Sequence, residues 1–123
     1  MSQDTLGDIL NQIMNAQRAK KTSIVTTRSS KLLIEVLNIM KQYGYIDYEL
    51  SERKLTISIK EISKCMAIKP RYTVGKKEIE KYIRRFLPAR NFGYVLVSTS
   101  KGLMTHQEAQ EKNIGGSLIA YFY

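Results

Sequence analysis

The segment Gly93-Tyr94-Val95-Leu96-Val97-Ser98-Thr99-Ser100-Lys101-Gly102 sets the architecture of the C-terminal half of this chain. Its apolar run is typical of a buried strand, predicted here over residues 92–97. Three hydroxyl side chains follow that strand directly, and they offer more donors and acceptors than a turn requires. Downstream, Gly115 and Gly116 allow another backbone to approach closely. We therefore expect a rigid polar surface that recognises a partner.

Around this segment the sequence predicts short elements bounded by proline, glycine or a capping residue. They are a strand over residues 71–74, a helix over 76–86, a helix that begins at His106, and a last strand over 117–123. The helix at His106 is supported by Thr105 and Glu108, which have the spacing of a capping box.

The N-terminal half has two apolar stripes at helical spacing and one alternating strand pattern. Ser29 or Ser30 caps the second helix, and Gly44 lies just past its end. The predicted elements are a helix from Leu6 to the region of Asn15–Gln17, a strand over 24–27, a helix before Gly44, and a hairpin over 45–59. The predicted fold is α/β (α+β), with an α-β-α-β-β lobe over residues 1–61 packed against a second lobe over 62–123.

The charge balance points to a polyanionic partner. The 123 residues include 20 Lys and Arg against 11 Asp and Glu, a net charge of +9. Residues 62–123 carry eleven basic and four acidic side chains, whereas residues 1–61 carry nine and seven. The first lobe still has a local basic cluster, formed by Arg18, Lys20, Lys21, Arg28 and Lys31. Two separate basic zones predict contact with an extended polyanion, such as nucleic acid or an anionic membrane surface.

Several function classes are disfavoured. No apolar run is long enough for a membrane span, and the N-terminus lacks the pattern of a signal peptide. Cys65 is the only cysteine, which excludes an internal disulfide and fits a reducing cytoplasm. We expect it to be a small buried apolar residue. No metal-ligand spacing or nucleotide-binding loop is present, so we expect no cofactor.

Catalytic chemistry is poorly supplied. His106, the only histidine, is expected to be a solvated residue at a helix start. A hydrolase that uses Ser98 with His106 remains as an alternative, as does an adaptor that binds a protein or an anionic surface through its basic faces.

Nucleic-acid chemistry is better supplied. Lys and Arg bind phosphates with little sequence preference, and hydroxyls can bond base edges and ribose 2′-OH groups. Tyr72, beside Arg71, is suited to stacking on an unpaired base or to lying half-buried at a strand. The outer face of the helix over 76–86 is suited to phosphates or to solvent alone.

Residues 96–105, followed by Glu108-Ala109 and Gly115-Gly116, resemble the C-terminal signature of the family of small-subunit ribosomal protein eight. Ile9-Leu10 and the segment 13–16 are similar to the family's opening helix. Lys69-Pro70-Arg71-Tyr72 and the segment 85–90 resemble its archaeal and eukaryotic branch. The resemblance covers nearly the whole chain.

The resemblance implies a non-enzymatic, cytoplasmic constituent of the small ribosomal subunit, which takes no small-molecule substrate. Its partners would be the central domain of small-subunit ribosomal RNA and neighbouring ribosomal proteins. In the C-terminal lobe, the implied RNA contacts are Ser98, Thr99, Ser100, Lys101, Gly115, Gly116, Tyr72, Arg71 and Arg90, with Thr99 and Ser100 reaching bases. In the N-terminal lobe, a second RNA element would meet Asn15, Lys20, Lys21, Arg28, Ser30 and Lys31.

Overall fold

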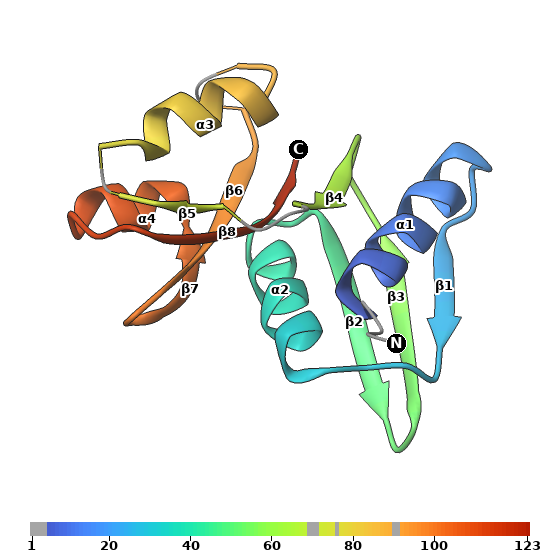
Figure 1. Cartoon of the computed structure of the whole chain (residues 1–123). Coiled ribbons are helices and arrows are strands. Elements are labelled where there is room, and N and C mark those ends of the chain that lie inside the picture. The colour runs from blue at the N-terminus through green and yellow to red at the C-terminus, as the bar shows by residue number, and fades with distance from the viewer. Residues whose placement is uncertain (1–4, 69–71, 76, 90–91) are drawn as a thin grey trace. The chain divides into compact units, whose positions relative to one another are not determined.

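The computed structural model describes residues 5–68, 72–75, 77–89 and 92–123. The chain contains helices together with antiparallel strands in separate sheets, which confirms the predicted α+β class (Figure 1). The chain divides into two compact units, Met1–Cys65 and Met66–Tyr123. The boundary predicted from the sequence was after residue 61, four residues earlier.

The N-terminal unit has the predicted order of elements. They are α1 (Thr5–Arg18), β1 (Ser23–Thr26), α2 (Lys31–Gln42), β2 (Ile46–Ser51) and β3 (Lys54–Ile59). The three strands form an antiparallel sheet in the order β1-β3-β2, so β1 is an edge strand. Ile57 of the central strand lies opposite Ile24 on one side and Tyr48 on the other. Figure 1 shows α1 beside β1 and α2 beside β2.

The apolar stripes of both helices build the core of this unit. The buried side chains of α1 and α2 are Leu6, Ile9, Leu10, Ile13, Met14, Ala16, Leu33, Val36, Leu37 and Met40. From the sheet, Leu55 and Ile57 are buried, whereas Ser58 between Ile57 and Ile59 is exposed. This alternation puts one sheet face in the core and leaves the other polar.

The ends of α2 follow the predicted chemistry. Ser30 has extended backbone, and its hydroxyl accepts a hydrogen bond from the backbone N–H of Leu33 at 3.1 Å, so Ser30 rather than Ser29 is the N-cap. Gly44, just past the helix, has φ +81°, a conformation that glycine adopts without steric cost.

The C-terminal unit is built around its long last strand, over residues 116–122, with which other strands of the unit pair. Its elements are β4 (Cys65–Ala67), which begins at the unit boundary, β5 (Thr73–Val74), α3 (Ile79–Phe86), β6 (Tyr94–Thr99), β7 (Gly102–Thr105), α4 (His106–Glu111) and β8 (Gly116–Phe122). The sheet order is β4-β8-β6-β7, and β5 also pairs with β8. Its core includes Val95 and Val97 of β6, Leu118 of β8, and Ile79 and Ile83 of α3.

Three predicted features of this unit were wrong or incomplete. No strand was predicted at β4 or at β7. Both strands are short and are stabilised by pairing with distant residues rather than by a local pattern. The helix α3 begins at Ile79, not at residue 76, and Glu78 provides no side-chain cap; residue 76 itself lies outside the described part of the chain.

Candidate nucleic-acid interface

The hairpin of β6 and β7 carries the hydroxyl-rich segment. Strand β6 continues through Ser98 and Thr99, so these residues belong to the strand and do not follow it as predicted. The strand is longer because Ser98 pairs on both sides, with Leu103 of β7 and with Ser117 of β8. Ser100 and Lys101 then form the exposed turn.

Thr99 holds this turn in shape. Its hydroxyl donates to the backbone carbonyl of Gly102 at 2.9 Å and accepts from the backbone N–H of Lys101 at 3.1 Å. Gly102 has φ +109°, which favours glycine at this position. Because its only proton is already donated, the Thr99 hydroxyl can offer a ligand an acceptor but not a donor.

Sheet register places three hydroxyl residues in a row across neighbouring strands. Ser117 of β8 lies opposite Thr73 of β5 on one side and opposite Ser98 of β6 on the other. Directly opposed residues of antiparallel strands point to the same face. Thr73 and Ser98 are exposed and Ser117 is half-buried, while the Oγ1 of Thr73 lies 3.5 Å from the Oγ of Ser117. We call Thr73, Ser117 and Ser98 the hydroxyl row.

The hydroxyl row ends beside the turn. Ser100 and Lys101 are exposed there, and among the described residues neither they nor Ser98 has a side-chain hydrogen bond or ion pair. Their donors and acceptors are therefore open to a ligand. Sequence reasoning missed Thr73 and Ser117 as members of this surface, because only the strand register brings them to Ser98.

Gly115 and Gly116 pack against the protein's own backbone. A Cβ on Gly115 would lie 2.3 Å from the carbonyl oxygen of Val74, and one on Gly116 would lie 2.2 Å from that of Ser98. Neither distance is compatible with a side chain. The two glycines thus allow the start of β8 to fit closely between β5 and β6, and they align the hydroxyl row.

An aromatic and basic cluster lies next to Thr73. The ring of Tyr72 stacks on Tyr82 of α3 with centroids 5.3 Å apart, and the guanidinium of Arg85 lies 5.8 Å from the Tyr72 centroid. Tyr72 is half-buried, and its carbonyl accepts a hydrogen bond from the N–H of Leu118. The structure thus adds Arg85 to this site. Arg71 and Arg90, the remaining predicted contacts, lie outside the described residues.

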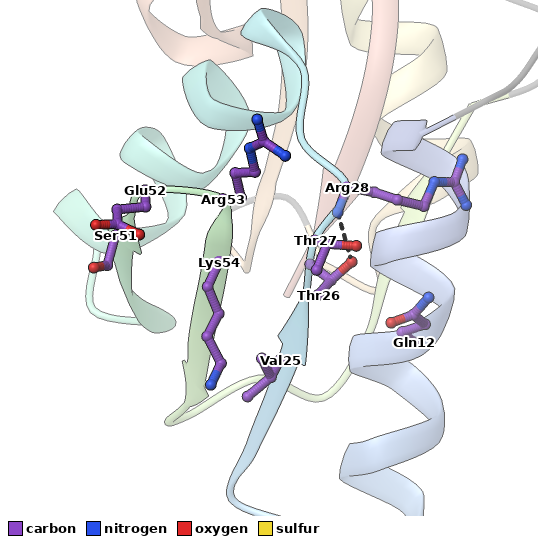
Figure 2. A pocket seen from close by; sticks show the side chains of 9 residues that line it. All are labelled: Gln12, Val25, Thr26, Thr27, Arg28, Ser51, Glu52, Arg53 and Lys54. Carbon is purple, nitrogen blue, oxygen red and sulfur yellow. Dashed lines mark hydrogen bonds between the residues drawn. The ribbon is translucent and has the colours of Figure 1, made fainter.

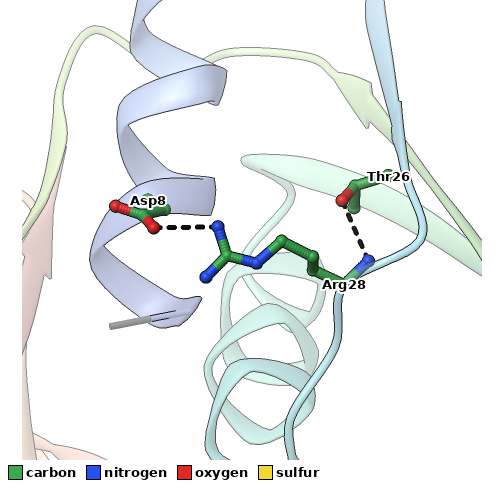
Figure 3. A network of polar contacts seen from close by, with 3 residues as sticks. All are labelled: Asp8, Thr26 and Arg28. Carbon is green, nitrogen blue, oxygen red and sulfur yellow. Dashed lines mark hydrogen bonds and ion pairs between the residues drawn. The ribbon is translucent and has the colours of Figure 1, made fainter. Parts of the chain in front are cut away.

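The predicted contacts of the N-terminal unit differ in availability. Asn15, Lys20, Lys21 and Lys31 are exposed, and the three lysines form no ion pair with a described residue. Arg28 donates to Asp8 at 2.8 Å, and its backbone N–H donates to the hydroxyl of Thr26 (Figure 3). The hydroxyl of Ser30 is used in the cap of α2. Arg28 and Ser30 thus have partners within the protein, whereas the three lysines have none among the described residues and are open to phosphate.

Two hollows lie beside strand β1 in the N-terminal unit. One, of about 600 Å³, is lined by Gln12, Asn15, Ala16, Ala19, Lys21, Ser23, Ile24 and Val25. The other, of about 610 Å³, is lined by Gln12, Val25, Thr26, Thr27, Arg28, Ser51, Glu52, Arg53 and Lys54 (Figure 2). Asn15 and Lys21 therefore share one hollow, and Arg28 lies at the next.

His106 is not solvated as predicted, since it is 2% exposed. Helix α4 follows β7 without a loop, so its first residue keeps the inward position of a strand residue. The Nδ1 of His106 accepts a hydrogen bond from the backbone N–H of Val95 at 3.1 Å, and burial lowers the pKa of the imidazole. The alternative in which His106 activates Ser98 is contradicted, because this ring is taken up by the core.

Cys65 is buried as predicted, and burial raises the pKa of its thiol to about 12. The thiol donates to the carbonyl of Leu10 at 3.4 Å and stays protonated, so it is not a nucleophile. Within the described ranges, no cluster of His, Cys, Asp and Glu could hold a metal ion. None of the described helices is long and apolar enough to cross a membrane.

Comparison with known proteins gives a consistent result. The family model described as ribosomal protein S8 matches residues 4–123. A curated relative from Schizosaccharomyces pombe, small ribosomal subunit protein uS8A, is 38% identical over 127 residues and 98% of each chain. A relative from Neurospora crassa, small ribosomal subunit protein uS8, is 40% identical over 124 residues, covering 96% of this chain and 95% of its own.

Proposed function

The chain belongs to the ribosomal protein S8 family, and from this premise we propose that it binds the central domain of small-subunit ribosomal RNA and supports assembly of that subunit. Its relatives are structural proteins of the small ribosomal subunit, and so is this chain. It is a cytoplasmic ribosomal component that associates with ribosomal RNA and ribosomal proteins, and it is not an enzyme.

The hydroxyl row is the observation that carries the RNA proposal. Neighbouring strands are about 4.8 Å apart, so Thr73, Ser117 and Ser98 present hydroxyls at nearly regular intervals on a rigid sheet. A hydroxyl donates and accepts at once, as does the ribose 2′-OH. We assign direct contacts to Ser98 and Ser100, whose hydroxyls have no partner among the described residues, and a supporting role to Thr99.

The cluster beside the row adds stacking and charge. Tyr72 stacks on Tyr82 and has the Arg85 guanidinium over its ring, and this aromatic and cationic cluster is suited to stacking with an unpaired base. The guanidinium of Arg85 and the ammonium of Lys101 supply phosphate contacts near opposite ends of the surface. In the N-terminal unit, Lys20, Lys21 and Lys31 provide the second, sequence-independent contact.

The test compares binding to a central-domain fragment of small-subunit ribosomal RNA with binding to a scrambled RNA of the same length. We expect Ser98→Ala and Ser100→Ala each to weaken specific binding about five- to tenfold, the scale of one lost polar contact. The matched control is Ser58→Ala, an exposed strand serine of the N-terminal unit. Unchanged affinity in both variants would refute the site, and equal wild-type affinity for the two RNAs would favour the basic adaptor.

A further inference from the structure

Backbone groups along the outer edge of strand β1 have no hydrogen-bond partner among the described residues. Ile59 donates its backbone N–H to the carbonyl of Thr22 at 2.8 Å, which fixes the phase of hydrogen bonding between β1 and β3. In an antiparallel pair the bonded positions alternate, so the backbone groups of Ser23 and Val25 point away from β3. Because β3 is the only strand that pairs with β1 in the described chain, these groups face the open edge.

The residues of the edge strand β1 include no charged residue and no proline. Natural edge strands are blunted by lysine, proline or a bulge. Strand β1 is Ser23-Ile24-Val25-Thr26, with none of these, and Val25 is 53% exposed. An uncharged edge strand with an exposed valine is suited to being covered in an assembly.

The two hollows beside β1 share Gln12 and Val25 as lining residues, and we call the two together the trough. On the side of α1, the small side chains of Ala16 and Ala19 leave room beside the strand. The trough is lined by all four residues of β1, and beyond β1 it reaches the β2–β3 turn at Arg53 and Lys54 (Figure 2). Its shape suits an extended segment that adds one more strand to the sheet.

The basic side chains around the trough favour an occupant with negative charge. Lys21 lies beside the edge, whereas Arg53 and Lys54 lie across β1 at the β2–β3 turn. All three are exposed and form no ion pair with a described residue, and Glu52 is the one acidic residue among the described lining. We propose that β1 is the docking site for an extended acidic segment of another protein, which pairs with Ser23 and Val25 as an added strand.

The backbone pattern favours a polypeptide over RNA in this trough. An added strand supplies N–H donors and carbonyl acceptors in alternation, and so satisfies both groups of Ser23 and of Val25. Phosphates supply acceptors only, so RNA would have to reach the two carbonyls with ribose or base donors instead. The exposed side chain of Val25 can also pack against an apolar side chain of an added strand.

The probe for a test is a seven-residue peptide of alternating glutamate and valine, added to the full-length, isotope-labelled protein. We expect the amide protons of Ser23 and Val25 to gain protection from hydrogen exchange. Methylation of the peptide's alternate backbone nitrogens should weaken binding about tenfold, since it removes hydrogen bonds but keeps charge and side chains. A matched peptide with lysine in place of glutamate should not bind.

Two variants at one position test the protein side. Val25→Pro removes an N–H that makes no bond to β3 and should reduce peptide affinity about tenfold, whereas Val25→Thr keeps the donor and the branched shape and should bind normally. If Val25→Pro does not fold, the methylated peptide still decides. Equal binding of methylated and unmethylated peptides, or no protection at Ser23 and Val25, overturns the proposal. The proposal is also overturned if a single-stranded RNA oligonucleotide, and not the peptide, protects the amide protons of Ser23 and Val25 from exchange.

Discussion

Gly116 lies so close to Ser98 that a Cβ atom on the glycine would be 2.2 Å from the serine carbonyl oxygen. The contact is between backbones, so no side-chain rotation can relieve it. The same proximity aligns Ser117 with Ser98 in the hydroxyl row. The Gly115-Gly116 motif was expected to bring the backbone close to RNA. Its glycines are needed for the packing of the protein's own sheet.

Replacing this glycine should destabilise the C-terminal unit. We expect Gly116→Ala to lower the free energy of unfolding by about 1–3 kcal/mol, the usual cost of overpacking, measured by urea denaturation. Gly75→Ala is the control, because a Cβ there meets only Glu78 Oε1 at an ordinary 3.6 Å. If Gly116→Ala kept full stability and lost only RNA affinity, the glycine would serve the ligand and not the packing.

His106 should make stability depend on pH in a defined window. Its folded-state pKa is lowered from 6.5 by burial, so the unfolded chain binds the proton more readily between the two pKa values. Stability is therefore full above pH 6.5 and falls as the pH drops below it. His106 is the only histidine, so no second imidazole titrates in that window, and denaturation at several pH values measures the slope.

A variant separates this effect from acid titration of carboxylates. His106→Gln keeps a hydrogen-bond acceptor for the N–H of Val95 but does not titrate. We expect its stability to be flat between about pH 5 and 7. A wild-type slope that survives in His106→Gln would show that another group is responsible.

The sequence predicts the parts of this site that depend on local residue spacing, but not the parts that depend on pairing between distant strands. The helices α1 and α2 and the capping of α4 by Thr105 follow local spacing, and each was predicted. Thr73 and Ser117, in contrast, are 44 residues apart in sequence and meet only through strand register. The local pattern identified Ser98 as a polar strand end, but the row that contains it depends on long-range pairing.

The burial of His106 shows a second limit. A capping box correctly predicts where a helix begins, yet it does not say what precedes the helix. Here β7 runs directly into α4, so the first helical residue lies against β6. Tertiary packing thus overrides the usual exposure of a residue at the start of a short helix.

Thr99 offers a test of indirect action on RNA binding. Thr99→Val is close in shape but removes both turn hydrogen bonds, so we expect about 1–2 kcal/mol lower stability of the hairpin and weaker specific RNA binding. Thr99→Ser retains the hydroxyl and should restore most of both properties. Hydrogen exchange at Lys101 measures the turn directly. A Thr99→Val protein with normal exchange but impaired binding would instead make Thr99 a direct RNA contact.

Ser30 distinguishes a structural from an RNA-binding role. Loss of the cap in Ser30→Ala should cost about 1 kcal/mol, measured by thermal denaturation. The control, Ser29→Ala, changes an exposed neighbour that does not cap the helix and should be neutral. RNA affinity measured well below the melting temperature should be unchanged in both variants, and a loss confined to Ser30→Ala would restore this serine as an RNA contact.

Lys20 should contribute charge rather than sequence recognition. Its φ of +60° lies in the left-handed region, which asparagine tolerates, so Lys20→Asn removes the charge with little backbone strain. We expect weaker binding to all RNAs and a salt slope shallower by about 1, as for one lost phosphate contact. Lys41→Gln is the control, because Lys41 is already paired with Asp47 at 3.3 Å and should matter less. Filter binding over a series of salt concentrations measures both slopes. Equal slopes for wild type and Lys20→Asn would place this lysine away from the RNA.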